Sequence, residues 1–323
     1  MEKVRVGMIG AGGMANAVHY PSLAEMEDVE IAAICDINEE RLHTTADKYN
    51  VERRYTDYRK MVAEVDPDAV YVIMPPHHLF DIVIWVLEQK KHVFIEKPPG
   101  VSKLQTISMA RTAERNGCIT MVGFNRRFIP LLVRAKEMVE THGPVLQAVA
   151  TFYKNTLEAQ VHPYYKGAVD ILTSDGIHAV DTLRWLCGGE VVSIASDVRS
   201  FSTAWENAFF ALVRFSSGAT GVLLTNWAVG KRVHTFEIHS LGISAFVDGN
   251  AKAMIYEDNR EDPTAVWDVK EVAGSDEFYR FYGFYHENRH FVDCVKEGRE
   301  PTTSFRDAVK TMELVEMIYK AQM

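Results

Sequence analysis

A glycine-rich turn near the start of the chain constrains the fold more than any other feature. An apolar, β-rich stretch leads directly into the pattern Gly10-x-Gly12-x-x-Ala15, and a helical stretch follows. The first glycine allows a tight turn, the second lets a ligand's pyrophosphate approach the backbone, and the alanine allows close packing of helix on strand. The pattern therefore predicts a dinucleotide-binding βαβ unit in which Gly13 and Met14, inside the turn, also contact the cofactor.

A carboxylate at the end of the second predicted strand indicates which dinucleotide is bound. Asp36 follows the glycine turn by about 20 residues, where a carboxylate accepts hydrogen bonds from the adenosine ribose and repels a 2′-phosphate. This favours NAD over NADP. Arg41 leaves NADP open, because a guanidinium nearby could be recruited to a phosphate.

The first third of the chain alternates short β-branched runs with amphipathic helical patterns. Such alternation is typical of βαβ units, and so of an α/β fold with a parallel sheet. The strands are predicted at Val4–Ile9, Val29–Cys35, Ala69–Met74, His92–Ile95 and Ile119–Val122.

Beyond Gly123 the alternation stops and strand follows strand, often across short turn signals, which favours a largely antiparallel sheet. A chain of 323 residues exceeds the size of a single core, so we predict two domains, 1–123 for the dinucleotide and 124–323 for the substrate. The strands of the second are predicted at Val145–Tyr153, Val191–Val198, Ala208–Phe215, Ala219–Trp227, Val233–Ser240, Ile243–Val247 and Ala253–Tyr256.

Composition and charge exclude several classes of protein. With 47% hydrophobic and 24% charged residues, the chain is neither disordered nor membrane-embedded. A net charge of −9 offers no general attraction to nucleic acid or anionic lipid. Four scattered cysteines without a CxxC pair, no leader and no long apolar run predict a cytoplasmic protein with reduced thiols.

The fourth predicted strand ends in Glu96-Lys97-Pro98. Ligands of open α/β sheets bind at the carboxyl ends of the strands, so Lys97 is placed where a substrate would meet the cofactor. Its ammonium group could polarise a carbonyl or hydrogen-bond a hydroxyl. The alternative is an ordinary lysine at the start of a loop.

A predicted helix over about 175–186 carries a second set of candidates. Its apolar stripe is flanked by a face that holds His178 and Asp181. An imidazole with a pKa near 6.5 suits a general base that takes a hydroxyl proton. Asp181 could orient the ring, and Asp175 could assist it or act instead. A lone helical histidine can equally be a core residue.

Together these motifs resemble the Gfo/Idh/MocA family, the group of glucose-fructose oxidoreductase and inositol dehydrogenase. The resemblance covers nearly the whole chain and is carried by Gly10-x-Gly12-x-x-Ala15, Glu96-Lys97-Pro98, Gly176-x-His178-x-x-Asp181 ahead of Arg184-Trp185-Leu186, and His286-x-Asn288-x-x-Phe291.

The resemblance implies a Rossmann domain followed by an α+β domain with a large open sheet, through which members usually form homodimers or homotetramers. It implies NAD(P)-dependent oxidation or reduction of a small sugar, inositol or related polyol, without a metal. Lys97 and His178 would be catalytic and would contact the substrate. Glu96 and Lys97 would adjoin the cofactor.

The resemblance also bears on weaker candidates. Many members carry an aspartate four residues before the histidine, where this chain has Ser174, so Asp175 is the expected carboxylate of the catalytic and substrate-binding set. The loop with Pro75 and His78 would lie along the cofactor, although His78 could equally be a solvated helix start.

Two further side chains are expected to bind substrate. Arg127 could hydrogen-bond sugar hydroxyls or a carboxylate, or instead form a salt bridge at the domain interface. Tyr165 lies in an aromatic loop suited to the apolar face of a sugar ring.

Two other functions stay open; the same residues would serve the first, and the presence of Lys97 and His178 counts against the second. One is a glycosidase or isomerase that oxidises its sugar transiently on NAD, with no net redox change. The other is a non-catalytic sensor of dinucleotide or sugar that acts through a partner protein. Product formed without NADH would mark the first, and turnover of any substrate would eliminate the second.

Overall fold

The structure is a computed structural model that describes residues 3–322. The chain forms two compact units. The first comprises the chain up to Phe124 together with Phe278–Arg280 and Phe284–Val309, and the second comprises Asn125–Glu277, Phe281–Gly283 and the chain from Lys310 onward. The assignment of the dinucleotide to residues 1–123 and of the substrate to residues 124–323 stays a prediction.

The first unit is built on a six-stranded parallel sheet of order β3-β2-β1-β4-β5-β6. This is the Rossmann order. Strands are added to one side of β1 up to β3 and then to its other side from β4 onward, and this switch leaves a crevice for a dinucleotide at the carboxyl ends of β1 and β4. The strands are β1 (Val4–Ile9), β2 (Val29–Cys35), β3 (Arg54–Tyr55), β4 (Ala69–Val72), β5 (His92–Glu96) and β6 (Thr120–Gly123).

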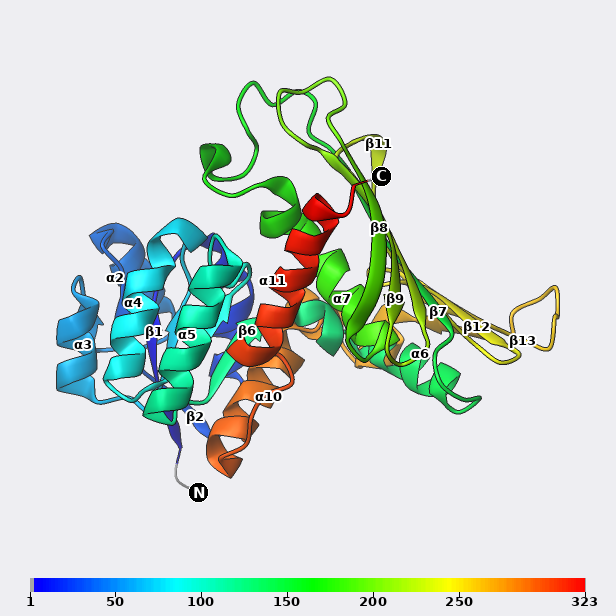
Figure 1. Cartoon of the computed structure of the whole chain (residues 1–323). Helices are drawn as coiled ribbons and strands as arrows, with labels where there is room; N and C mark the ends of the chain where they lie inside the picture. Colours follow the sequence, from blue (N-terminus) through cyan, green and yellow to red (C-terminus); the bar gives the residue numbers. More distant parts are fainter. Residues whose placement is uncertain (1–2, 323) are drawn as a thin grey trace. The chain divides into compact units, whose positions relative to one another are not determined.

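Helices cover this sheet. The glycine turn runs into a π-helical turn, η1 (Ala15–His19), and α1 (Tyr20–Ala24), which pack with the late helix α10 (Phe284–Glu297). Helices α3, α4 and α5 stand side by side in Figure 1, and α4 and α5 contact each other. Their bounds are α2 (Glu39–Lys48), α3 (Tyr58–Val65), α4 (Pro76–Glu88) and α5 (Lys103–Asn116).

The second unit holds an eight-stranded sheet of order β14-β13-β12-β11-β7-β10-β9-β8. All neighbours are antiparallel except β7 and β10. The strands are β7 (Gln147–Asn155), β8 (Val191–Arg199), β9 (Ala208–Phe215), β10 (Thr220–Asn226), β11 (Ala228–Ser240), β12 (Ile243–Asp248), β13 (Lys252–Glu257) and β14 (Ala265–Asp268).

One face of this sheet carries helices. α6 (Pro130–Glu140) packs on β11, β12 and β13, and α7 (Ile177–Cys187) packs on β7 and β10. A π-helical turn, η4 (Leu172–Gly176), leads into α7. The remaining helical segments are η2 (Asn125–Phe128), η3 (Tyr165–Gly167), α8 (Val269–Ala273), α9 (Phe278–Phe281) and α11 (Phe305–Lys320).

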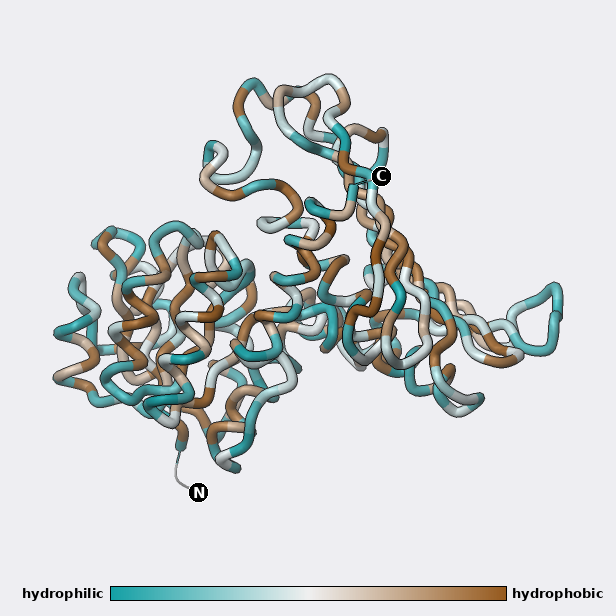
Figure 2. The backbone as a smooth tube through the Cα atoms, in the orientation of Figure 1, coloured by the Kyte–Doolittle hydropathy of each residue, from teal (hydrophilic) through white to brown (hydrophobic). Residues whose placement is uncertain are grey.

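Hydropathy follows this architecture. β4 and most of β1 and β5 are buried, as expected for strands covered on both faces, and the loop between β13 and β14 is hydrophilic in Figure 2. Within residues 3–322 no helix has the length and apolar character needed to cross a membrane. The expected fold class, an α/β Rossmann unit followed by a mostly antiparallel sheet, is confirmed.

Candidate functional site

The glycine turn leaves an open approach to the backbone at the end of β1. Gly10 has φ +112°, and a Cβ there would lie 2.1 Å from the Ile73 carbonyl oxygen, so only glycine fits. A Cβ on Gly12 would meet no described atom within 4 Å. The turn thus offers bare backbone at the start of a helix, the arrangement that accepts a pyrophosphate.

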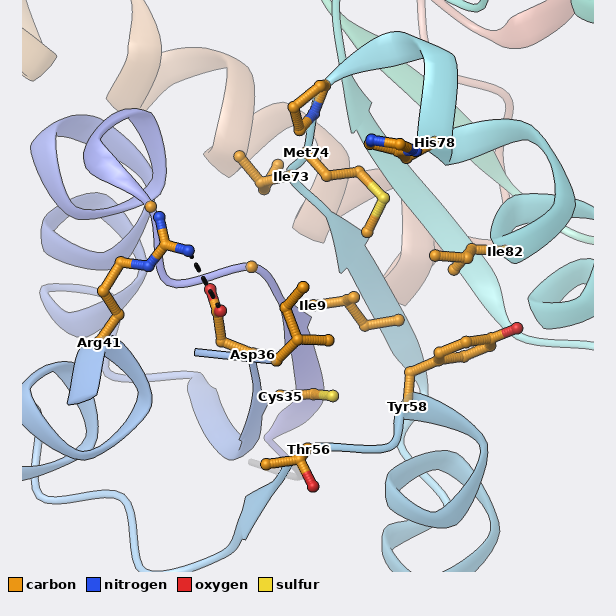
Figure 3. A pocket seen from close by; sticks show the side chains of 14 residues that line it. Ile9, Cys35, Asp36, Arg41, Thr56, Tyr58, Ile73, Met74, His78 and Ile82 are labelled. Carbon is orange, nitrogen blue, oxygen red and sulfur yellow. Dashed lines mark ion pairs between the residues drawn. The ribbon is translucent and has the colours of Figure 1, made fainter. Parts of the chain in front are cut away.

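A cavity of about 350 Å³ lies beside this turn (Figure 3). Five of the residues predicted to bind cofactor line it together: Gly10, Gly12, Asp36, Pro75 and His78. The rest of the wall is largely apolar, with Ile9, Ile37, Ile73 and Ile82 among its members. An apolar slot edged by a few polar groups suits an adenosine moiety. His78 lines the cavity although its side chain is exposed, so both interpretations of this residue remain open.

The carboxylate of Asp36 is held in place at the edge of this cavity. One oxygen accepts a hydrogen bond from the backbone N–H of Ala11 at 2.8 Å, and the other accepts one from the N–H of Asn38 at 2.8 Å. The Arg41 guanidinium lies 3.8 Å from the same group, as Figure 3 shows. The carboxylate keeps lone pairs for further donors, as a ribose-binding carboxylate must.

The two other predicted contacts of the turn lie away from this cavity. Gly13 lines a neighbouring hollow of about 420 Å³, together with Gly12, Arg41 and Lys48. The Met14 side chain is exposed. The side chains of Arg41 and Lys48 therefore lie near the open backbone of the turn, where a pyrophosphate would carry negative charge.

A buried chain of hydrogen bonds supports the end of β5. Glu96 accepts from the backbone N–H of Lys97 at 3.1 Å, and its other oxygen lies 3.0 Å from His19 Nε2. The second nitrogen of His19 lies 3.2 Å from the Asn288 amide of α10. The helix after the glycine turn and a helix from the end of the chain therefore both fix the strand end that carries the half-buried Lys97.

The same group has side chains of the types that bind divalent cations. The ligand atoms of His19, Glu96 and Glu287 lie within 4.8 Å of one another. His19 and Glu96 hydrogen-bond each other directly, and this pair supports the end of β5.

In the second unit, three donors converge on the carboxylate of Asp175 in η4. The ammonium of Lys154 at the end of β7 and the hydroxyl of Tyr164 both bond its Oδ2, and Trp227 Nε1 lies 3.3 Å from the same atom. Burial, followed by the charge of Asp175, raises the pKa of Tyr164 well above its usual value, so its hydroxyl stays protonated and donates. The three donors fix the position of the Asp175 carboxylate.

His178 lies one turn further on, on the first turn of α7, and only 4% of its surface is exposed. Its ring centroid is 6.5 Å from that of a second buried histidine, His234 on β11. His178 thus follows Asp175 by three residues, across the junction of η4 and α7.

Arg127 and Asp181 form a buried ion pair in the same unit. Arg127 Nε and Nη2 donate to the two oxygens of Asp181 at 2.7 and 2.6 Å, and Thr311 donates to the same carboxylate. The sequence allowed a salt bridge at the domain interface as the alternative for Arg127, and the salt bridge that forms lies within the second unit. Its neighbour Arg126 instead donates to the Asn125 side chain at 2.6 Å and stacks over Tyr282.

The aromatic loop places Tyr164, and not Tyr165, against Asp175. The Tyr165 side chain is 39% exposed and has a positive φ of 49°. Sequence reasoning passed over Lys154, Tyr164, Trp227 and His234. A signal existed for two of them. Lys154 shares one side of β7 with three buried apolar residues, and His234 shares one side of β11 with the buried Phe236 and Ile238.

Comparison with known proteins assigns both units. Residues 4–124 match the model of an oxidoreductase family with an NAD-binding Rossmann fold, GFO_IDH_MocA, and residues 132–240 match the C-terminal domain model of the same group. The chain is 27% identical to myo-inositol 2-dehydrogenase of Thermotoga maritima over 320 residues, which covers 94% of this chain and 92% of that protein.

Solved structures share the whole fold. A dehydrogenase from Chromobacterium violaceum superimposes with a TM-score of 0.89 at 23% identity, covering 100% of this chain and 96% of that one. Levoglucosan dehydrogenase, solved with NADH and levoglucosan, gives a TM-score of 0.86 at 19% identity, covering 99% and 97%. At these identities the likeness shows the fold alone.

Proposed function

Since the chain belongs to the GFO/IDH/MocA oxidoreductase family, we propose that it transfers hydrogen between NAD and a hydroxyl-bearing carbon of a sugar, inositol or related polyol. It is an NAD-dependent dehydrogenase or reductase that acts on CH–OH groups. The substrate class is supported by the relative named myo-inositol 2-dehydrogenase, which matches along nearly the whole chain.

The residues of the first unit fit the cofactor. The open backbone at Gly12 would receive the pyrophosphate, Asp36 would bind the adenosine ribose, and the apolar cavity beside them would take the adenine. When bound, NAD takes up the hydrogen that leaves the substrate carbon as hydride. Glu96 and Lys97 would adjoin the nicotinamide end.

The observation that carries the catalytic assignment is the buried position of His178 on the first turn of α7, directly after the turn η4 that holds Asp175. In the oxidative direction, the O–H proton of the substrate passes to an imidazole nitrogen of His178, which acts as general base. The fixed carboxylate of Asp175 stabilises the imidazolium that forms. Lys97 donates a hydrogen bond to the reacting oxygen and stabilises its negative charge as the proton leaves. In the reductive direction His178 returns the proton.

We further infer that the open face of the second sheet joins copies of this chain into a homodimer or homotetramer. A row of paired residues crosses all eight strands on the face opposite the helices. Leu212 is 52% exposed in this row and Phe246 is 37% exposed. The row consists of Val266, Met254, Phe246, Glu237, Val149, Val222, Leu212 and Ala195.

The proposed activity is tested by incubating the protein with NAD and a panel of sugars, inositols, sugar acids and glycosides. NADH absorbance that rises together with a product two hydrogens lighter is the expected result. Product without NADH would indicate a glycosidase or isomerase that cycles its cofactor. Absence of any product across the panel would contradict the proposal.

A further inference from the structure

His234 is a buried imidazole to which the mechanism above assigns no task. Its side chain is 4% exposed on β11, and neither ring nitrogen has a hydrogen-bond partner among the described residues. The ring stacks on Phe152 with centroids 4.1 Å apart and planes inclined by 4°, so its orientation is fixed. Both polar atoms therefore point in set directions without a protein group to receive them.

Such an arrangement is costly unless another molecule completes it. A buried donor or acceptor left without a partner loses about 1–3 kcal/mol, and native structures rarely leave both nitrogens of one imidazole in this state. A core histidine with a purely structural role would hydrogen-bond a neighbour, as His19 does with Glu96 and Asn288.

The charged groups around His234 set its protonation state. Burial and the nearby guanidinium of Arg126 hold its pKa well below the usual value; Arg232 and Lys154 act in the same direction, and Asp175 opposes them. The imidazole is therefore neutral, with one N–H donor and one acceptor nitrogen. A hydroxyl group also both donates and accepts, so its chemistry matches this ring.

We propose that His234 is a substrate-binding residue whose imidazole hydrogen-bonds a second hydroxyl of the polyol, beside the hydroxyl that is oxidised. This inference rests on the proposed function. An N–H···O hydrogen bond spans about 2.9 Å. The ring centroids of His178 and His234 lie 6.5 Å apart, a separation that two hydroxyl groups of one small polyol can bridge. The expected substrate is therefore a compound with neighbouring hydroxyl groups.

The test compares wild type with His234→Phe, which keeps the stacking on Phe152 but removes both polar atoms. The probes are myo-inositol, D-glucose and D-xylose, each with its monodeoxy analogues, offered to the NAD-loaded protein. For a parent compound we expect His234→Phe to raise KM roughly threefold to tenfold, the effect of one hydrogen bond, with kcat less affected. His234→Gln, which restores a donor and an acceptor, should recover part of this loss.

The decisive readout is discrimination between analogues. Wild type should reject one particular monodeoxy analogue, and His234→Phe should accept that analogue as readily as the parent. His239→Phe is the matched control, because His239 lies on the same strand but already bonds Ser244.

If wild type turns over a probe and His234→Phe shows the same KM and the same discrimination between analogues, this inference is overturned while the proposed function stands. His234 would then have a structural role or bind a water molecule. Turnover of none of the probes would count against the proposed function, and the inference would fall with it.

Discussion

At the scale of single residues, the two glycines of the turn meet different surroundings. A side chain on Gly10 would run into the backbone at Ile73, whereas one on Gly12 would meet only the space proposed for the pyrophosphate. The first glycine is thus needed by the fold and the second by the ligand.

This difference gives a paired prediction. Gly12→Ala should leave the thermal midpoint unchanged but weaken NAD binding by at least about tenfold, or about 1.4 kcal/mol. Gly10→Ala should lose about 2 kcal/mol or more of folding stability. Calorimetry of unfolding and titration with NAD measure the two effects. If Gly12→Ala bound NAD as wild type does, the pyrophosphate would have to lie elsewhere.

His178 provides the second prediction at this scale. His178→Ala should lower turnover by roughly 10²–10⁴, the usual contribution of a general base, and leave NADH affinity nearly intact. Steady-state kinetics and NADH fluorescence titration check the two parts. Unchanged turnover would remove His178 from the mechanism.

How far single residues were predictable depended on their surroundings. Asp36 follows from a spacing rule, because the β-α-β geometry places it beside the turn. Tyr164 could not be separated from Tyr165, since the direction of a loop side chain depends on backbone angles that sequence does not reveal. Asp175 lies in a π-helical turn, where α-helical spacing no longer gives the face of a side chain.

At the scale of elements, α10 packs on the first unit although it comes late in the chain. Arg289 and Lys296 of this helix both donate to Asp28 at 2.7 Å, just before β2. The same helix supplies Asn288 to the support of β5. The docking of α10 therefore helps to position the end of β5, which leads into Lys97.

This contact should make stability depend on pH. The hydrogen bonds from Arg289 and Lys296 hold the pKa of Asp28 well below its unfolded value of about 3.9. The carboxylate then stabilises the fold fully above that value, and the contribution is lost as pH falls below about 4 towards the folded pKa. For this partly exposed group we expect about 1 kcal/mol.

Urea unfolding at pH 7 and pH 3 measures the effect. Asp28→Asn should be less stable than wild type at pH 7, and the difference between the two proteins should be smaller at pH 3, where part of the contribution of the charge is already lost. A constant difference between the two proteins at both pH values would show that the charge of Asp28 contributes nothing.

Elements were predictable where periodicity is strong. The strands β1, β2 and β9 lie where their β-branched and aromatic runs predicted. The two-residue β3 and the short β14 carry too little pattern to be detected. The parallel pairing of β7 with β10 escaped prediction because a strand's own sequence does not identify its partner across the sheet.

At the scale of the whole molecule, three exposed apolar side chains in the row across the second sheet, Leu212, Phe246 and Val266, predict assembly. Leu212→Glu should convert the proposed homodimer or homotetramer into smaller species, because a buried, unpaired carboxylate is costly at an interface. Light scattering during gel filtration measures the mass. Leu104→Glu, at an equally apolar but separate exposed position on α5, is the control. A wild type that is monomeric at micromolar concentration would refute the assembly.

The proposed passage of hydrogen from a CH–OH carbon to NAD can be followed directly by isotope transfer. A panel substrate deuterated at the carbon that is oxidised is incubated with the protein and NAD, and the nucleotide and product are analysed by mass. We expect NADH that is one mass unit heavier, formed in an amount equal to that of the oxidised product. Deuterium found in the solvent, or retained in a product formed without net NADH, would contradict it.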